Sequence, residues 1–168
     1  AYLGGDSYAG TDIGVANLHA TENGYSQETF TTTYTDQTGA TQTDSYQLSA
    51  ANLSADTIAD EVNNNLNGAT ATAFNKATIS NISAATGTSA ITLEGETVFT
   101  FGTDTSSSDM AANINNNATL QTAGIYAVNN GTSLEVFATD GRDLNFVHDT
   151  TNTSDTMDIT GLNGTSQT

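Results

Sequence analysis

The chain contains one short segment written twice, as Leu53-Ser-Ala-Asp-Thr-Ile58-Ala-Asp-Glu-Val62-Asn-Asn-Asn65 and Thr105-Ser-Ser-Ser-Asp-Met110-Ala-Ala-Asn-Ile114-Asn-Asn-Asn117. At a constant offset of 52 positions, the matching pairs are Ser54 and Ser106, Ile58 and Met110, and Val62 and Ile114. In each copy a serine suited to an N-cap precedes apolar residues spaced along one face of a helix. Such a repeat predicts two similar small units rather than one domain with one active site.

The residues around the first copy predict a hairpin before its helix and strands after it. Phe30, Thr32 and Tyr34 alternate with Thr residues, which indicates a half-buried strand. Asp36-Gln37-Thr38-Gly39 is a turn signal, and Tyr46 and Leu48 mark the returning strand. Beyond the helix, Ala71, Ala73 and Ile79 predict two further short strands.

The second copy is surrounded by the same order of elements. Ile91 and Leu93 lead into a Glu94-Gly95 turn, and a strand follows at Val98, Phe99 and Phe101. Ser106 and Asp109 have the spacing of a capping box, with Asp in place of Glu. Asn130-Gly131 is the strongest hairpin signal of the chain. It separates a strand at Ile125–Asn129 from one at Leu134 and Val136, and Leu144 and Phe146 close the unit.

These patterns predict an α+β fold of two tandem strand–strand–helix–strand–strand units, each a small, mostly antiparallel sheet covered by one short helix. We expect a connecting segment at 1–27, a first unit at 28–85, a second unit at 86–148 and a polar return segment at 149–168. The return segment is polar and poorly periodic, apart from Met157, Ile159 and Leu162.

Composition excludes several classes of partner. The chain has 19 acidic residues against two basic ones, Lys76 and Arg142, and a formal net charge of −17. Phosphate binding needs clustered Lys or Arg, so nucleic acids and anionic membranes are not expected as partners. With no cysteine, the chain has no disulfide, thiolate nucleophile or thiolate metal site. The chain begins at Ala1, and we expect it to be a fragment of a longer protein.

The second unit resembles the flagellin IN motif, found in the variable outer part of bacterial flagellins and in some hook-associated proteins. The resemblance lies in Ser89–Val98, the helix Ser106–Asn115, Ala123–Ala127, the strand at Leu134–Val136 and the turn at Asp140-Gly141. The first unit is similar in its helix and in Ala71–Ala73, but has a longer hairpin upstream. Together the two copies cover roughly residues 28–147.

The resemblance implies a structural, extracellular module of the bacterial flagellum that supports motility. It also implies that the long terminal helices of the filament core lie outside this chain. The partners it implies are other flagellin subunits, including neighbouring outer domains, and no cofactor. The alternative is the outer domain of a flagellar cap or hook-associated protein, or a glycan-binding adhesin that stacks sugars on exposed tyrosines such as Tyr2, Tyr8 and Tyr25.

No residue is predicted to be catalytic, to bind a cofactor or to ligate a metal. Gly5-Asp6-Ser7-Tyr8 is similar to a Gly-Asp-Ser esterase block, but Ala16 and Asn145 stand where that family has an Asp three residues before its histidine. The two histidines, His19 and His148, are expected in exposed loops. The acidic residues that could gather around Ca²⁺ are Asp140, Asp143, Asp149, Asp155 and Asp158, but they lack EF-hand spacing.

Overall fold

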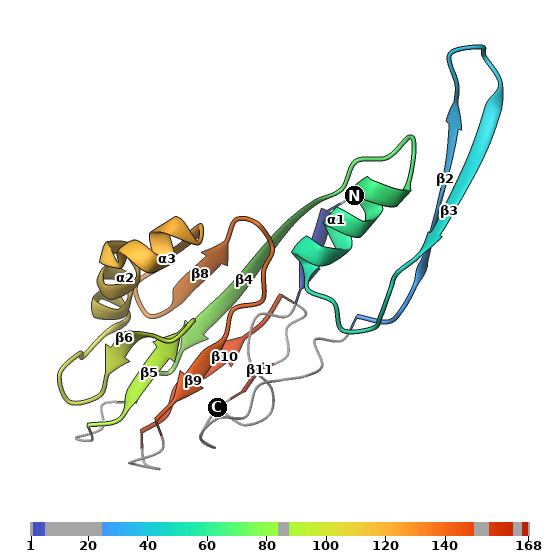
Figure 1. Ribbon diagram of the computed structural model, residues 1–168. Coiled ribbons are helices and arrows are strands. Elements are labelled where there is room, and N and C mark those ends of the chain that lie inside the picture. The colour runs from blue at the N-terminus through green and yellow to red at the C-terminus, as the bar shows by residue number, and fades with distance from the viewer. Residues whose placement is uncertain (1, 6–24, 84–87, 150–154, 163–165, 168) are drawn as a thin grey trace.

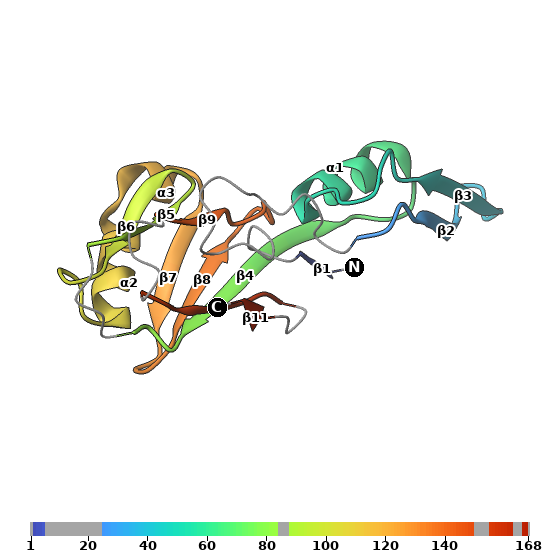
Figure 2. The same ribbon diagram turned by 90° about the horizontal axis from the view of Figure 1, so that it is seen from below.

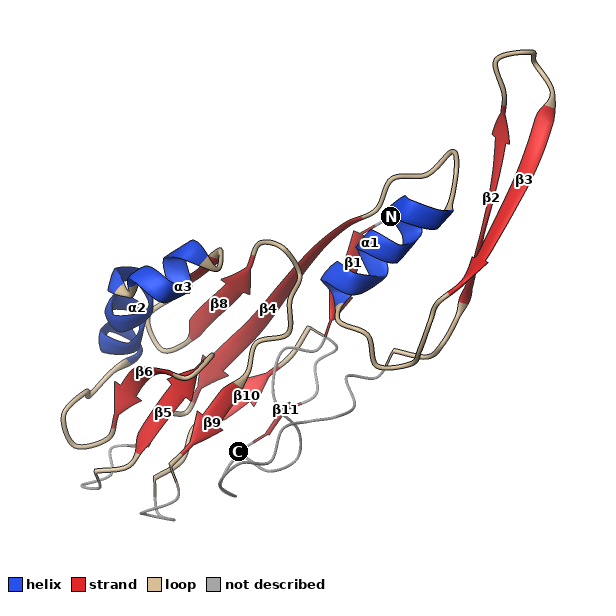
Figure 3. Cartoon of the chain, viewed as in Figure 1, coloured by secondary structure: helices blue, strands red, loops and turns tan. Residues whose placement is uncertain are grey.

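The computed structural model describes residues 2–5, 25–83, 88–149, 155–162 and 166–167, with the backbone alone at 2–5 and 166–167. The fold is α+β, as predicted, with short helices packed on small, mostly antiparallel sheets (Figures 1 and 3). A large sheet has the order β11-β10-β4-β8-β7, with β1 also pairing with β4; a three-stranded sheet has the order β6-β5-β9; and β2 and β3 form a separate hairpin.

The hairpin of β2 (Thr29–Thr35) and β3 (Thr41–Gln47) projects from one end of the molecule (Figure 1). Its register runs from Thr29 opposite Gln47 to Thr35 opposite Thr41. The predicted turn between them is confirmed. One carboxylate oxygen of Asp36 accepts the N–H groups of Thr38 and Ala40 at 2.9 and 3.0 Å, which closes the loop.

Helix α1 (Ala55–Asn65) packs the predicted apolar face into a small first core. The buried residues of this core are Leu48, Ile58, Ala59, Val62, Leu66 and Ala71. Ser54 occupies the N-cap position, but its hydroxyl does not bond the helix backbone. It contacts the carboxylate of Asp56 and the hydroxyl of Thr57 instead.

Strand β4 (Thr72–Ser80) is a single nine-residue strand, so the prediction of two short strands here was wrong. No glycine or turn sequence interrupts it, and its second half alternates buried with half-buried residues. Its first half pairs in parallel with β1 (Tyr2–Gly5), within the predicted connecting segment. Its second half pairs with β8 and β10. This strand therefore links two regions of the molecule.

The second unit follows the predicted order up to its last strand. The hairpin of β5 (Ala90–Leu93) and β6 (Glu96–Thr100) precedes α2 (Ser107–Asn116) and the short α3 (Ala118–Thr122). The capping box of Ser106 and Asp109 is confirmed. So is the Asn130-Gly131 turn, which joins β7 (Ile125–Asn129) to β8 (Leu134–Ala138). The closing strand β9 (Phe146–His148) pairs with β5 rather than with β8.

The second core lies between the large sheet and a layer made of the helices and the three-stranded sheet (Figure 2). The return segment contributes to it through β10 (Asp158–Thr160) and the adjacent Met157, while β11 (Ser166–Gln167) pairs with β10. The largest buried side chains of this core are Phe99, Phe101, Ile79, Ile91, Leu93, Met110, Ile114, Leu120, Ile125, Leu134 and Leu144. The division at residue 85 stays a prediction, and β4 supplies Ala77 and Ile79 to this second core.

The two units contain the same pair of side-chain hydrogen bonds, made by asparagines at equivalent positions of the repeat. The side-chain amide of Asn63 donates to the carbonyl of Ala71 at 2.9 Å and accepts its N–H at 2.8 Å. Asn115, 52 positions later, makes the same pair of bonds to Ala127, both at 2.8 Å. Each asparagine thus bonds the backbone N–H and carbonyl of one alanine, in the way that a neighbouring strand would.

The turn after β8 joins the two units. Gly141, at φ +87°, lies against β4, and its carbonyl accepts the N–H of Asp56 in the first turn of α1 at 3.3 Å. A Cβ at Gly141 would lie 2.3 Å from the Cβ of Ala73. The buried Asn75 of β4 donates to the carbonyl of Arg142 at 3.1 Å. Contact between the units therefore depends on a close backbone approach that only glycine permits.

Candidate functional site

A buried polar cluster is the arrangement in the described residues that comes nearest to a catalytic constellation. Ser89, at the start of the β5 hairpin, donates its hydroxyl proton to the carboxylate of Asp155, and its Oγ lies 3.1 Å from Nε2 of His148. Ser89, Asp155 and His148 are 0, 2 and 6 % exposed. His148 was expected in an exposed loop, and this expectation was wrong. It belongs to β9, and β9 is buried by its pairing with β5.

The order of hydrogen bonds in this cluster is unsuited to nucleophilic catalysis. In a serine triad the histidine takes the serine proton and the carboxylate orients the histidine. Here the serine donates directly to Asp155, and the histidine meets the serine oxygen. Burial lowers the pKa of His148 below its ordinary value, although the charges of Asp155 and Asp149 oppose this shift. A neutral imidazole then donates from Nε2 to Ser89, and the cluster ties β5, β9 and the segment before β10 together.

The sequence missed this cluster because its members lie 59 and 66 positions apart. Only the pairing of β5 with β9, and of the return segment with β4, brings them together. The esterase-like residues Asp6, Ser7 and Tyr8, as well as His19, lie outside the described residues.

Three of the candidate Ca²⁺ ligands, Asp140, Asp155 and Asp158, each bond a different partner. Asp140 pairs with Arg142 at 2.7 Å, and Asp158 accepts the Asn81 amide at 2.6 Å. Asp155 bonds Ser89, and the side chain of Asp143 is exposed. Within the described part of the chain, no three acidic or histidine side chains gather closely enough to hold a metal ion. In the same residues no helix has the length and apolar character needed to cross a membrane.

Many surface carboxylates are held in the ionised form by hydrogen bonds. Bonds from the Thr38 and Gln42 side chains, with further bonds from the backbone, lower the pKa of Asp36 to about 2. Backbone and side-chain bonds from Asn67 lower the pKa of Asp44, and bonds from Ser49 lower that of Glu61. These three carboxylates are therefore charged at neutral pH.

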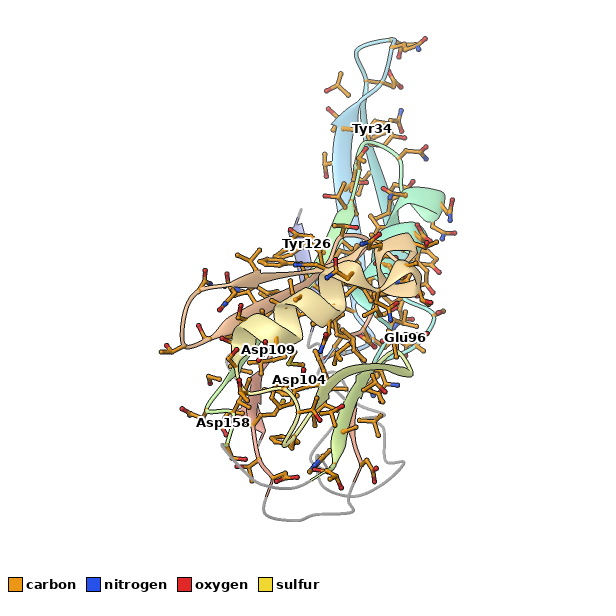
Figure 4. All side chains as sticks on the ribbon, turned by 90° about the vertical axis from the view of Figure 1, so that its left-hand side faces the viewer. Tyr34, Glu96, Asp104, Asp109, Tyr126 and Asp158 are labelled. Atoms are coloured by element: carbon orange, nitrogen blue, oxygen red, sulfur yellow. The ribbon has the colours of Figure 1, made fainter. Side chains whose placement is uncertain are left out.

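The outward face of the large sheet carries an aromatic row. Lys76 of β4, Phe137 of β8 and Tyr126 of β7 lie side by side in register. The rings of Tyr126 and Phe137 stack at 5.0 Å and 11°, and Lys76 Nζ lies 6.0 Å from the centre of the Phe137 ring. Figure 4 shows Tyr126 on the side of the sheet away from helix α2. Tyr126 and Val128 are the large apolar side chains most exposed among the described residues.

A hollow of about 270 Å³ opens beside this row, lined by Phe74, Tyr126, Phe137, Ala138 and Thr139. Its edge is shaped by Thr139, whose N–H and hydroxyl both bond the carbonyl of Gly124 at 3.1 Å. Gly124 adds no side chain there, and a Cβ on it would lie 2.4 Å from Thr139 Oγ1. Among the tyrosines expected to stack on sugars, only Tyr25 has a described side chain. Tyr25 is half-buried against the first core, and the side chains of Tyr2 and Tyr8 lie outside the described residues.

The sequence signal for the aromatic row was the alternation of Tyr126 and Val128 with buried residues of β7. This alternation does not reveal an exposed aromatic row, because the sequence does not show which face of the strand the helix covers. No protein-family model and no curated protein matches this chain.

Proposed function

We propose that this chain is the surface-exposed outer module of a bacterial flagellin, a structural part of the filament without catalytic residues. The observation that carries the proposal is the repeated unit. Two helices begin 52 positions apart, each follows a hairpin, and each anchors the chain beyond it through an equivalent asparagine. A tandem repeat of this kind suits a module that sets shape and spacing.

The residues that resemble the flagellin IN motif have coherent structural roles in the second unit. Ser89–Val98 covers most of the β5–β6 hairpin, Ser106–Asn115 is the capped helix α2, and Ala123–Ala127 is the entry into β7. These segments bury their apolar residues in one core. Their pattern is therefore explained by packing, and this agrees with a structural rather than a catalytic role.

The charge of the module supports a place on the outside of an assembly. With a net charge of −17 and surface carboxylates held ionised, neighbouring copies repel one another and remain hydrated. Such a surface resists sideways association of filaments. The partners in this proposal are other flagellin subunits through the parent filament, and the location is extracellular.

Immunogold labelling of intact cells of the source organism tests the proposal directly. Antibodies raised against this chain are expected to label flagellar filaments along their whole length, because flagellin repeats along the shaft. Label at filament tips only would assign the chain to a cap protein, and label at the hook to a hook-associated protein. Label on other fibres or on the cell wall would assign it to an adhesin, and each of these results would overturn the proposal.

A substrate screen tests the absence of catalysis separately. Aryl esters and aryl glycosides are expected to show no turnover above that of the Ser89→Ala variant. Turnover by the wild type that is lost in this variant would make the buried cluster an active site and would contradict a purely structural module.

A further inference from the structure

We propose that the hollow beside Tyr126 and Phe137 binds one ring of a neutral saccharide. This inference goes beyond the filament role and does not depend on it. The site is built from three strands of the large sheet, with Phe74 on β4, Phe137 on β8 and Tyr126 on β7, and Thr139 directly follows β8.

The first support is the geometry of the rings. The rings of Tyr126 and Phe137 are nearly parallel with centres 5.0 Å apart, so they overlap face to face. Phe137 thereby holds Tyr126, which lies on the edge strand β7 and is 42 % exposed, so the outer face of the Tyr126 ring forms a fixed aromatic surface. The axial C–H bonds of a pyranose form an apolar face that packs on such a surface. Because sheet pairing fixes both backbones, little ordering is needed on binding.

The second support is size. The hollow measures about 270 Å³, which is below the range of about 300–1,000 Å³ typical of sites for drug-sized ligands. One sugar ring suits such a space, while a longer chain would extend across the open face. The polar groups around the rings are also held in place, Thr139 by its bond to Gly124 and Lys76 by its ion pair with Glu135 at 2.6 Å.

The third support is charge, which selects a neutral ligand. Lys76 is the only lysine of the chain, and its charge is already balanced by Glu135. Glu135 in turn accepts the amide of Asn130 at 3.1 Å, and its bonds to Lys76 and Asn130 lower its pKa. Sulfated or carboxylated sugars are repelled by the net charge of −17, and the Lys76 charge that could attract them is already paired with Glu135. A second copy of the chain meets the same repulsion.

Saturation-transfer difference NMR on the whole chain tests the inference with methyl β-D-glucopyranoside, lactose, N,N′-diacetylchitobiose and a sulfated heparin disaccharide. We expect transfer to the ring C–H protons of at least one neutral sugar, with a dissociation constant in the millimolar range because the contact area is small. We expect no transfer to the sulfated disaccharide.

Two variants and a matched control locate the site. Tyr126→Ala and Phe137→Ala are each expected to weaken binding by about tenfold, since the first removes the stacking ring and the second removes the ring that holds it in place. Val128→Ala is the control because Val128 lies on the same strand and face and is as exposed as Tyr126, both at 42 %. Tyr126→Phe keeps the ring and is expected to retain most of the affinity.

Three results would overturn the proposal. These are the absence of transfer to all three neutral sugars, transfer that survives both alanine substitutions, and preferential transfer to the sulfated disaccharide. Sedimentation of the same samples measures self-association, and so distinguishes a sugar site from an interface between two copies of the chain. If the wild type associates with itself and Tyr126→Ala does not, while no neutral sugar binds, the aromatic row is an interface between copies instead.

Discussion

The first and second units use the same local design but differ in how much they bury. In the described residues, the first core has six buried apolar side chains, while the second has 20. Both place a short helix over the chain beyond it and both use an asparagine to hold that chain. The difference teaches that a repeated motif supplies local structure, whereas stability depends on the area that the surrounding sheet buries.

Strand β4 explains how the smaller unit remains folded. Its first half covers α1, and its second half is a central strand of the large sheet. The first unit is therefore attached to the second along one continuous backbone, and the turn at Gly141 adds a second contact. We expect the first unit to open without the second, but not the reverse.

The largest effects are expected from truncating equivalent core residues of the two helices. Ile58→Ala and Met110→Ala remove side chains that are 1 and 0 % exposed, each at a cost of about 2–5 kcal/mol. Met110→Ala is expected to lower the free energy of unfolding of the whole chain. Ile58→Ala is expected to reduce amide hydrogen-exchange protection in α1 alone while β7 and β8 keep theirs. Equal loss of protection in both units after Ile58→Ala would contradict this view.

The contact between the units is tested by Gly141→Ala, with Gly131→Ala as control. Both glycines have positive φ, at +87° and +90°, so both variants carry a backbone penalty of about 1–2 kcal/mol. Only Gly141 also faces a close neighbour, because a Cβ at Gly131 meets nothing within 4 Å. Crowding against Ala73 adds about 1–3 kcal/mol. Urea denaturation is expected to show the larger loss for Gly141→Ala, and equal losses would show that the units do not depend on this approach.

The shared asparagines give a smaller, paired effect. Asn63→Ala and Asn115→Ala each leave a backbone N–H and carbonyl of a buried alanine without that partner, at a cost of about 1–3 kcal/mol. Asn64→Ala and Asn116→Ala are exposed controls on the same helices and correct for the better helix propensity of alanine. Thermal unfolding of the four variants measures the difference. Destabilisation no greater than in the controls would mean that the amide bonds are dispensable.

The smallest effect is a pH dependence between pH 5.5 and 7.5 that His148 gives to the second unit. Burial keeps the folded-state pKa of His148 below its unfolded value, so the unfolded chain binds the proton more readily. The stability contributed by the neutral imidazole is therefore lost as the pH falls below about 6.5. We expect the urea midpoint of the wild type to fall more between pH 7.5 and pH 5.5 than that of the His148→Gln variant. An identical pH response of the two proteins would be evidence against a buried, neutral His148.

Local elements were predictable because their signals are local. The spacing of Ile58 and Val62 and of Met110 and Ile114 predicts both helices, and each does pack its apolar face into a core. The Ser106 capping box and the Asn130-Gly131 turn also depend on residues close in the chain. Strand partners outside the hairpins were not predictable, since a period of two fixes which residues face inward but not which strand lies alongside.

The pairing of β9 with β5 and of β10 with β4 had no local signal, and these pairings bury His148, Asp155 and Ile159. The same limit applies to the candidate saccharide site. Tyr126 and Phe137 are 11 positions apart and their stacking depends on the hairpin register, while Phe74 reaches the site through the pairing of β4 with β8.

The sequence by itself determined the doubled helix, its caps and its apolar face, because helix periodicity and turn chemistry act over a few residues. It also determined the acidic, cysteine-free surface that limits the choice of partners. The tertiary structure alone decided that the repeats are unequal, with β4 shared by two cores and the second core completed by the distant strands β9 and β10. The reason is that burial depends on which distant segments meet, and the same helix gains more where more sheet surrounds it.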